Sequence, residues 1–417
     1  MTKTLFPHVK VVIFRYKMRV KSTILVLLVL SVVFVSFQQI EVVKAQGTIY
    51  IRADGTVEGT DKIQRDGNIY TFTGNISGAI IFEKGGIVID GNGYTLTGDA
   101  NNHGFYLSHV NDTIIKNVRI ESCNNGFYLR LSLNNTITGN TVTGNNVGIY
   151  LRASKNTLIT ENNVLNNDQI GICCFRSEND IITNNIVKDN GGNGIESVYS
   201  MVNCYLSENE ILNSGLNGIK MDWASNTTIT GNEIQNSAEN GIRVYESRNN
   251  TISKNNIEDN KANGIYLHTY CFHNVILLNN ITSNSEYGID NNRYSAINLI
   301  HHNNFIDNGN QTTTYPGETN TWGWDNGFPS GGNYWSDYNG TDNNGDGIGD
   351  TPYIIDENNQ DNYPLMNPFD ISTTQEFSTI PEFPSWTPLL IMLLAVVAVA
   401  VIYRRIIHTR NQERRGQ

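Results

Sequence analysis

The fold of this chain is decided by a stretch, residues 126–151, that reads GFYLRLSLNNTITGNTVTGNNVGIYL. It opens with Gly and an apolar residue, and the same start recurs 22 residues later at Gly148. The recurrences, at intervals of 22 to 24 residues, are Gly104, Gly126, Gly148, Gly171, Gly194, Gly218, Gly241, Gly264 and Gly288. Self-similarity at such a period predicts a solenoid in which each repeat forms one coil.

A second pattern lies in each interval: an apolar residue, Asn three positions later, and another apolar residue two positions after that. The Asn residues assigned to it are Asn140, Asn162, Asn184, Asn209, Asn232, Asn255, Asn279 and Asn303. In the third repeat the pattern is assigned to Ile181, Asn184 and Ile186. The apolar positions are mostly Ile and Val in period-2 runs, and Asn and Gly favour turns. No window suits an amphipathic helix, so we predict an all-β, parallel β-helix with about three short strands per coil.

The Asn column has a physical reason. Coils stack about 4.8 Å apart, so identical amide side chains can hydrogen-bond along the stack. The flanking Ile and Val side chains form one apolar core. Because no coil buries its own face, both ends need caps.

Charge separates the ends of the chain from its middle. Residues 46–385 carry 17 basic and 38 acidic residues, whereas residues 1–45 carry seven basic residues and one acidic residue. Such an acidic middle argues against nucleic acid as a partner. It suits cations or an exposed, soluble surface.

Both termini predict a location at the cell surface. Residues 1–45 have the basic and apolar regions of a signal peptide, with Met18 as an alternative start and an uncleaved anchor as the alternative reading. After a linker at 367–385, residues 386–403 are apolar and long enough for a transmembrane helix. The basic tail at 404–417 then predicts a cytoplasmic end, with the solenoid outside.

Within the repeats of residues 104–310, residues one and three after each Gly are predicted to point inward, and those two and four after it outward. The outward positions combine aromatic and basic residues, and we take these as candidate substrate-binding residues: Tyr106, Tyr128, Arg130, Tyr150, Arg152 and Tyr245. Aromatic faces stack on pyranose rings, and Arg binds hydroxyl or carboxylate groups. The alternative is that outward Tyr reflects strand propensity alone.

Further along the same columns lie candidate catalytic residues: Lys220, Asp222, Arg243, Tyr266 and His268. A lyase or epimerase needs a base, here His268 or Tyr266, and a group that neutralises a uronate carboxylate, here Arg243 and Lys220. A hydrolase needs two facing carboxylates, for which Asp222 is a candidate.

Residues 46–103 precede the regular repeats and are predicted to form the first coils and an N-terminal cap. Residues 311–366 interrupt the repeat and are rich in Trp and Tyr, which predicts a closing module. Within it, Asp342, Asn344, Asp346 and Asp350 resemble the start of a calcium-binding loop. Tyr353 stands where an EF-hand has Glu, so the alternative is a turn without calcium.

The five cysteines are Cys123, Cys173, Cys174, Cys204 and Cys271, and their odd number argues against a disulfide framework. Cys174 occupies an inward position and is predicted to be core. His268, Cys271 and His273, with His301 and His302 about one coil on, form a candidate site for a soft metal, with chance clustering in a turn as the alternative.

On these residues the chain, over roughly 48–366, resembles the NosD-like family of right-handed parallel β-helix proteins, named after a periplasmic copper-related factor. The most specific resemblance is the stretch 332–353 with Asn362-Tyr363-Pro364-Leu365, which is similar to the closing segment of archaeal surface members. Pro381-Glu382-Phe383-Pro384 is similar to archaeal sorting signals. The resemblance implies a copper role, but the sequence holds no Met-rich or His-rich copper motif.

Three function hypotheses follow. The first is a non-catalytic surface protein that binds a polysaccharide or another cell-envelope component. The second is a polysaccharide lyase, epimerase or hydrolase, because β-helix enzymes of these kinds resemble this chain in fold. The third, by family analogy alone, is a copper-handling accessory protein.

Overall fold

The computed structural model describes residues 47–291, 294–314 and 322–371. Residues 1–45, 386–403 and 404–417, for which we predicted a signal peptide, a transmembrane helix and a cytoplasmic tail, lie outside these residues. Within the described ranges, no helix is both long and apolar enough to cross a membrane.

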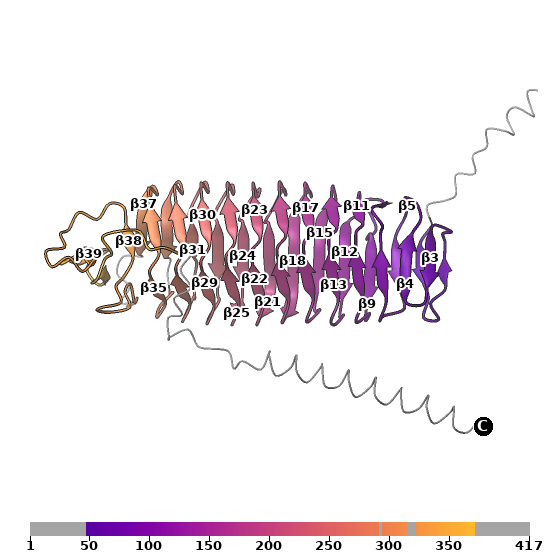
Figure 1. Ribbon diagram of the computed structural model, residues 1–417, viewed down its shortest axis with the longest axis horizontal. Helices are drawn as coiled ribbons and strands as arrows, with labels where there is room; N and C mark the ends of the chain where they lie inside the picture. Colours follow the sequence, from indigo (N-terminus) through magenta and orange to yellow (C-terminus); the bar gives the residue numbers. More distant parts are fainter. Residues whose placement is uncertain (1–46, 292–293, 315–321, 372–417) are drawn as a thin grey trace, which may run out of the picture. The chain divides into compact units, whose positions relative to one another are not determined.

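Three long sheets form the walls of a parallel β-helix, and successive coils stack along one axis (Figure 1). We call them sheets A, B and C. The strands of sheet A are β1 Ile49–Ile51, β2 Val57–Glu58, β6 Ile80–Phe82, β9 Phe105–Ser108, β12 Asn125–Arg130, β15 Val147–Arg152, β18 Ile170–Glu178, β21 Ile195–Val202, β24 Ile219–Asp222, β25 Ala224–Ser225, β28 Ile242–Tyr245, β31 Ile265–Leu267, β34 Tyr287–Asn291 and β37 Asn310–Thr314.

Sheets B and C have 12 strands each. The strands of sheet B are β3 Ile63–Asp66, β4 Ile69–Phe72, β7 Val88–Asp90, β10 Ile114–Lys116, β13 Thr136–Thr138, β16 Leu158–Thr160, β19 Ile181–Thr183, β22 Tyr205–Ser207, β26 Thr228–Thr230, β29 Thr251–Ser253, β32 Val275–Leu277 and β35 Leu299–His301. The strands of sheet C are β5 Ile76–Ser77, β8 Thr95–Thr97, β11 Arg119–Glu121, β14 Thr141–Thr143, β17 Asn163–Leu165, β20 Ile186–Lys188, β23 Glu210–Leu212, β27 Glu233–Gln235, β30 Asn256–Glu258, β33 Asn280–Thr282, β36 Asn304–Ile306 and β38 Tyr334–Trp335.

The all-β parallel solenoid predicted from the repeats is confirmed, and its register follows the Gly column. Phe127 pairs with Ile149, and Leu129 pairs with Leu151, all four fully buried. Inward side chains from the three sheets form one continuous apolar core.

The repeated Gly permits the coils to approach closely. A Cβ atom built on Gly148 would lie 2.5 Å from the carbonyl oxygen of Gly171 and 2.7 Å from Cγ1 of Val164. Real Cβ atoms do not come so close to backbone oxygen, so a side chain at this position would push neighbouring coils apart.

A buried amide column runs along the corner between sheets B and C. Its members, each donating from Nδ2 to the side-chain oxygen of the next, are Asn140, Asn162, Asn185, Asn209, Asn232, Asn255, Asn279, Asn303 and Asn333. The same Nδ2 groups donate to a backbone carbonyl of the preceding coil, as from Asn140 to Ile115 at 3.1 Å. Each amide side chain therefore provides hydrogen-bond partners for backbone groups of the turn that would otherwise be buried and unpaired.

The assignment of Asn184 to this column is wrong by one residue. Asn184 is exposed, at a φ of 54°, and its side chain bonds the hydroxyl of Thr183. Asn185 points inward instead. Likewise Ile181 and Ile186 are exposed, because a shift of one position in a strand reverses the face to which a side chain belongs.

Aromatic residues close the C-terminal end of the core. Trp335 on β38 stacks on Phe305 with ring centroids 4.5 Å apart, and it is 1% exposed. Its indole Nε1 donates to Oδ2 of Asp361 at 2.9 Å. Asp361 lies in the short antiparallel pair β39 (Tyr353–Ile354) and β40 (Gln360–Asp361).

Candidate functional site

The outer face of sheet A carries most of the predicted site residues. Strand pairing places Tyr106, Tyr128 and Tyr150 in one column, and Arg130 beside Arg152 in the next. The columns continue through Lys220 and Asp222 on β24 to Arg243 and Tyr245 on β28, then to Tyr266 on β31 and to His268 just after it. The face thus brings aromatic and charged side chains from successive coils together.

The tyrosines of the first coils stack on one another. Ring centroids are 5.6 Å apart between Tyr106 and Tyr128 and 5.4 Å apart between Tyr128 and Tyr150, with nearly parallel planes. His103 stacks on Tyr128 as well, at 4.3 Å, and Tyr128 is only 7% exposed. The prediction that these rings offer open faces to a pyranose is therefore wrong for Tyr128, because neighbouring rings cover its faces.

Two arginines border this tyrosine stack, and a third lies on the coil that follows it. The guanidinium of Arg152 donates to the hydroxyl of Tyr128 at 3.2 Å, and that of Arg130 donates to Oγ of Ser108 at 3.5 Å. Arg176, on the next coil, lies over the ring of Tyr199 at 5.9 Å. Within the described ranges, none of the three arginines forms an ion pair. This part of the face is locally positive on an otherwise acidic protein.

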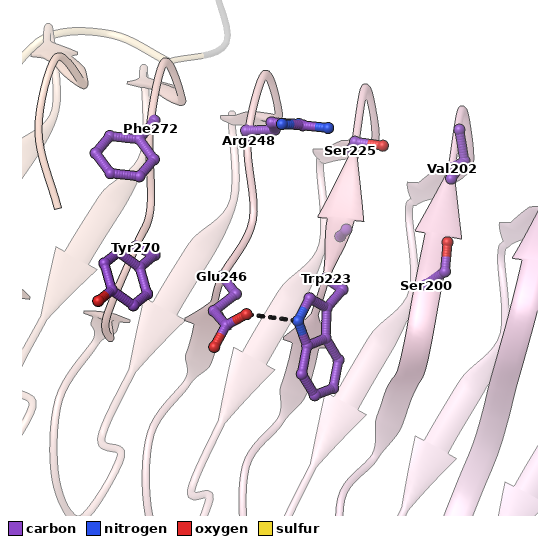
Figure 2. Close-up of a pocket in the computed structure, with 9 residues that line it drawn as sticks. Ser200, Val202, Trp223, Ser225, Glu246, Arg248, Tyr270 and Phe272 are labelled. Carbon is purple, nitrogen blue, oxygen red and sulfur yellow. Dashed lines mark hydrogen bonds between the residues drawn. The ribbon is translucent and has the colours of Figure 1, made fainter. Parts of the chain in front are cut away.

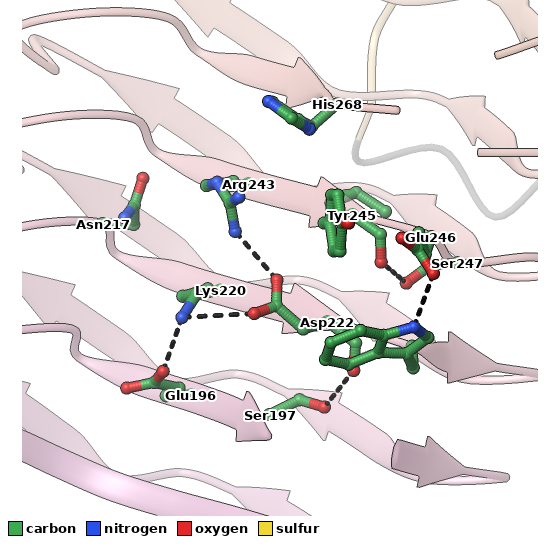
Figure 3. A network of polar contacts seen from close by, with 12 residues as sticks. Glu196, Ser197, Asn217, Lys220, Asp222, Arg243, Tyr245, Glu246, Ser247 and His268 are labelled. Carbon is green, nitrogen blue, oxygen red and sulfur yellow. Dashed lines mark hydrogen bonds and ion pairs between the residues drawn. The ribbon is translucent and has the colours of Figure 1, made fainter. Parts of the chain in front are cut away.

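Farther along the face, four charged side chains form one network (Figure 3). Nζ of Lys220 lies 2.7 Å from Oε1 of Glu196 and 3.2 Å from Oδ2 of Asp222. Nη1 of Arg243 lies 2.8 Å from Oδ1 of Asp222. Burial lowers the pKa of Lys220, but the hydrogen bond and charge of Glu196, joined by Asp222, outweigh burial and raise it. Two cations and two anions leave the network neutral.

His268 lies beside this network. Its Nδ1 atom is buried, and no hydrogen-bond partner for it is found among the described residues. Burial, and then the charge of Arg243, lower its pKa, so the imidazole is neutral at pH 7 and able to accept a proton. The rings of Tyr245 and Tyr266 lie 5.2 Å and 5.1 Å from it. The predicted base and cations are thus neighbours, but both cations already have carboxylate partners.

A groove of about 530 Å³ lies at the turn between sheets A and B (Figure 2). Its lining includes the aromatic residues Trp223, Tyr270 and Phe272 and the charged residues Glu246 and Arg248. Sequence reasoning missed this groove because Trp223 is five positions after Gly218, and Tyr270 is six after Gly264, outside the two outward columns. The sequence feature that could have revealed the groove is the large aromatic residue that follows the sheet A strand in both repeats.

The loop predicted to bind calcium folds around its own backbone. Asp342 accepts hydrogen bonds from the amides of Gly345 at 2.7 Å and Gly347 at 2.8 Å. Oδ2 of Asp350 accepts from the amide of Asn343 at 2.8 Å. Hydrogen bonds from backbone amides, the largest from Gly347, lower the pKa of Asp342. Calcium at Asp342, Asn344, Asp346 and Asp350 stays a prediction.

The candidate soft-metal cluster is dispersed. Cys271 is buried, and its thiol donates to the carbonyl of His268 at 3.0 Å. His301 and His302 are buried side by side near the closing module, where Nε2 of His302 lies 2.8 Å from the carbonyl oxygen of Ser330. Across the residues that the structure describes, no group of three or more His, Cys, Asp or Glu side chains is arranged to hold a metal ion.

Comparison with known proteins adds a family and a fold. The family model described as periplasmic copper-binding protein (NosD) matches residues 169–279 and 193–340, and the model of the right-handed β-helix region matches residues 68–211. None of the curated proteins matches the chain significantly.

Solved structures share the architecture. A mutant of the periplasmic alginate epimerase AlgG matches with a TM-score of 0.53 and 15% identity, over 64% of this chain and 81% of that chain. The A-module of the Azotobacter vinelandii mannuronan C-5 epimerase AlgE4 matches with a TM-score of 0.48 and 16% identity, over 65% and 90%. An alginate lyase from a Paenibacillus species matches with a TM-score of 0.37 and 14% identity, over 60% and 89%. The AlgG match alone among these three has a TM-score above 0.5, and at 15% identity its likeness concerns the fold alone.

The matched regions contain the coils, the Asn columns and the face described above. Both family models agree with the parallel β-helix seen in the structure, and they confirm its right-handed type. The two matches, with the parallel β-helix itself, support a NosD-like family of right-handed β-helix repeat proteins for this chain, with the NosD model matching residues 169–340.

Proposed function

We propose that this protein binds an anionic polysaccharide along the outer face of sheet A, without converting it chemically. The observation that carries the proposal is the pair Arg130 and Arg152, which share one column on neighbouring coils, with Arg176 close by on the next coil, one position after the residue that pairs with Arg152. Among the described residues, none of these three arginines forms an ion pair. Guanidinium groups bind carboxylate or sulfate through paired hydrogen bonds.

Regular spacing favours a polymer over a single anion. Neighbouring coils of a β-helix lie about 4.8 Å apart, so the guanidinium groups of Arg130 and Arg152, which share one column, present a repeated positive charge along the stack. The protein as a whole has a formal net charge of −11, which repels a polyanion at long range. Local attraction at the arginines must therefore provide the affinity for the polyanion, and added salt should weaken this affinity.

In this proposal the tyrosine stack positions an arginine and does not itself contact the ligand. Because Arg152 donates to the hydroxyl of Tyr128, the buried ring holds the guanidinium in place. A pre-positioned arginine loses less side-chain entropy when it binds an anion. The fold agrees with a carbohydrate ligand, since the alginate epimerase that shares it acts, by its name, on a polysaccharide.

Catalysis is not part of the proposal. A lyase or epimerase must neutralise the uronate carboxylate of its substrate. Lys220 and Arg243, the cations next to His268, are already paired with Glu196 and Asp222. A uronate would have to displace these carboxylates at a partly buried network.

We further propose that binding takes place at the cell surface, with residues 386–403 as the membrane anchor. This part rests on sequence alone, namely the predicted signal peptide at 1–45 and the basic tail at 404–417. Fractionation of the producing cells and protease treatment of intact cells would test it, since an intracellular, protected solenoid would contradict it.

The binding test uses the purified protein and soluble polymers. Affinity electrophoresis with alginate, polygalacturonate and dextran sulfate should retard the protein at low salt, whereas neutral dextran should not. Replacing Arg152 by Ala should weaken retardation at least fivefold. Arg119→Ala on sheet C, which removes an arginine paired with Glu121, is the matched control and should leave retardation unchanged. Equal retardation of the Arg152→Ala variant and the natural protein would overturn the proposal.

A further inference from the structure

The proposed function places an anionic polysaccharide at Arg130 and Arg152. In addition, we propose a second carbohydrate site: the groove at the turn between sheets A and B binds a neutral sugar ring. This site is independent of the proposed function, because it lies on other residues and uses aromatic contacts rather than charge. It is centred on Trp223, Glu246 and Tyr270 (Figure 2).

The first observation is the order of side chains along the turn. Strand register places Trp223, Glu246 and Tyr270 at equivalent positions of three successive coils, since Ser225 pairs with Arg248 and Arg248 pairs with Phe272. Aromatic pairs lie on both sides of the middle coil. Tyr199 and Trp223 stack with ring centroids 5.6 Å apart, and Tyr270 and Tyr294 stack 5.5 Å apart. The row of aromatic rings is interrupted only at Glu246, where the groove lies.

The second observation is that these rings add nothing to the core. Trp223 is 40% exposed and Tyr270 48% exposed, although both are large apolar side chains. Both also have positive φ angles, 53° and 59°, where Asn or Gly is more favourable. Most turn residues of the stack with positive φ are Asn, Asp, Ser or Glu. Solvent-exposed aromatic residues at unfavourable backbone positions point to a binding role rather than to stability.

The third observation is the polar composition of the groove. Oε2 of Glu246 accepts a hydrogen bond from Nε1 of Trp223 at 2.6 Å, which fixes the indole next to the carboxylate. Arg248 also lines the groove, and within the described residues it forms no ion pair. A ligand here meets apolar ring surfaces and, beside them, a carboxylate acceptor, a guanidinium donor and the lining serines Ser200 and Ser225.

A neutral pyranose matches this composition. Its C–H face packs on aromatic rings, and its hydroxyl groups both donate to a carboxylate and accept from a guanidinium. The volume of about 530 Å³ lies within the range of small-molecule sites. A uronate would place its negative charge near Glu246, so the neutral ring is the better fit.

Fluorescence offers a direct test with the full-length protein. Among the four tryptophans of the described residues, Trp223 is exposed, whereas Trp322, Trp324 and Trp335 are buried. Trp386 lies outside the described residues, so Trp386→Phe serves as the background protein, and a ligand in the groove should then change chiefly the emission of Trp223. The probes are neutral hexasaccharides of glucose, mannose, galactose and N-acetylglucosamine, each titrated separately. We expect at least one to quench or shift the emission in a saturable way.

Variants then assign the signal to the groove. Trp223→Phe should remove the fluorescence change, and Tyr270→Ala should weaken binding at least tenfold when measured by calorimetry. The matched control is Tyr205→Ala, which removes an equally exposed tyrosine from sheet B and should leave binding unchanged. Circular dichroism of each variant would show that the β-helix is intact.

Two results would overturn the inference. One is that none of the hexasaccharides changes the emission, and the other is that Tyr270→Ala binds as tightly as the natural protein. A tyrosine- or proline-rich peptide that binds in place of every sugar would also overturn it, in favour of a protein partner. Failure of the two proposals is distinguishable, because loss of polyanion binding follows Arg152→Ala and loss of neutral-sugar binding follows Tyr270→Ala.

Discussion

The side-chain amide of Asn162 donates to the side-chain oxygen of Asn185 across 3.0 Å, and the amide of Asn185 donates to Asn209 across the same distance. Both groups are buried, and Asn185 also donates to the backbone carbonyl of Ile159. Each coil is thereby bonded to the coil before it and the coil after it. The column is the polar counterpart of the aliphatic core.

Replacing Asn185 by Ala should therefore destabilise the protein. The substitution leaves several buried hydrogen-bonding groups without partners, and we expect the free energy of unfolding to fall by about 2–4 kcal/mol. Denaturant unfolding followed by circular dichroism measures this change. The neighbouring variant Asn184→Gly is the control, because Asn184 is exposed and Gly accepts its positive φ. An equal loss in both variants would show that the column does not stabilise the stack.

A pH dependence is expected from Asp180, which is buried at the corner between sheets A and B, where Asn135 and Asn250 stand in other coils, and accepts a hydrogen bond from the amide of Thr157 at 2.7 Å. Burial raises the pKa of this carboxyl to about 7. In the unfolded chain its pKa is ordinary, about 3.9. Between these values the folded protein holds the proton more tightly, so stability should fall as the pH rises from about 4 to about 7, and then stay level.

The variant Asp180→Asn tests this dependence, because an amide cannot ionise and suits this corner. At pH 8 it should be more stable than the natural protein by up to about 4 kcal/mol, and at pH 4 most of this difference should disappear. Asp361 and Asp290, whose pKa values burial raises to about 7 and about 6, contribute to the slope that remains. A difference between the two proteins that does not vary with pH would contradict the assignment to Asp180.

The closing module should contribute strongly to stability through Trp335. Removing its indole by Trp335→Ala exposes the ring of Phe305 and leaves the buried carboxyl of Asp361 without one donor. We expect a loss of about 3–5 kcal/mol in the free energy of unfolding. Phe328→Ala in the same module is the control, since Phe328 is 64% exposed and its removal should change little. Thermal unfolding of both variants compares them directly.

The ion network gives a prediction for the proposed function. Asp222→Asn removes the shared partner of Lys220 and Arg243 and gives the outer face of sheet A one additional positive charge. We expect polyanion binding to become several times tighter at low salt and more sensitive to added salt. Glu121→Gln, which frees Arg119 on sheet C, should have no such effect. Unchanged binding in Asp222→Asn would indicate that the polymer does not reach this part of the face.

Periodicity predicted the fold well because the structural rules of a β-helix are local. A Gly needed for close approach, an apolar residue inward and an Asn at the corner recur in every coil, so one repeat such as 126–148 contains the information. The error at Asn184 arose where two Asn residues stand side by side, and both Ile181 and Ile182 fit an apolar position. Only the strand pairing of Ile182 with Ile159 resolves that choice.

The candidate site was predicted less completely, because it depends on contacts between coils. The columns correctly placed Lys220, Asp222 and Arg243 together, but a column does not reveal that the three neutralise one another. Nor does it show that Tyr128 is covered by its neighbours. The groove depends on Tyr270, which stands one position later in its coil than Trp223 does, a displacement that repeat alignment conceals.

The strand pairing in the first coil affects whether molecules can join end to end. At this end, β1 pairs with β2, and β3 pairs with β4, in antiparallel fashion, whereas the coils that follow pair in parallel. An antiparallel edge of a few residues is a poor template for a further parallel strand from another molecule. Stacked β-layers with an open parallel edge can join end to end into fibres, and the reversed pairing at this edge disfavours such joining.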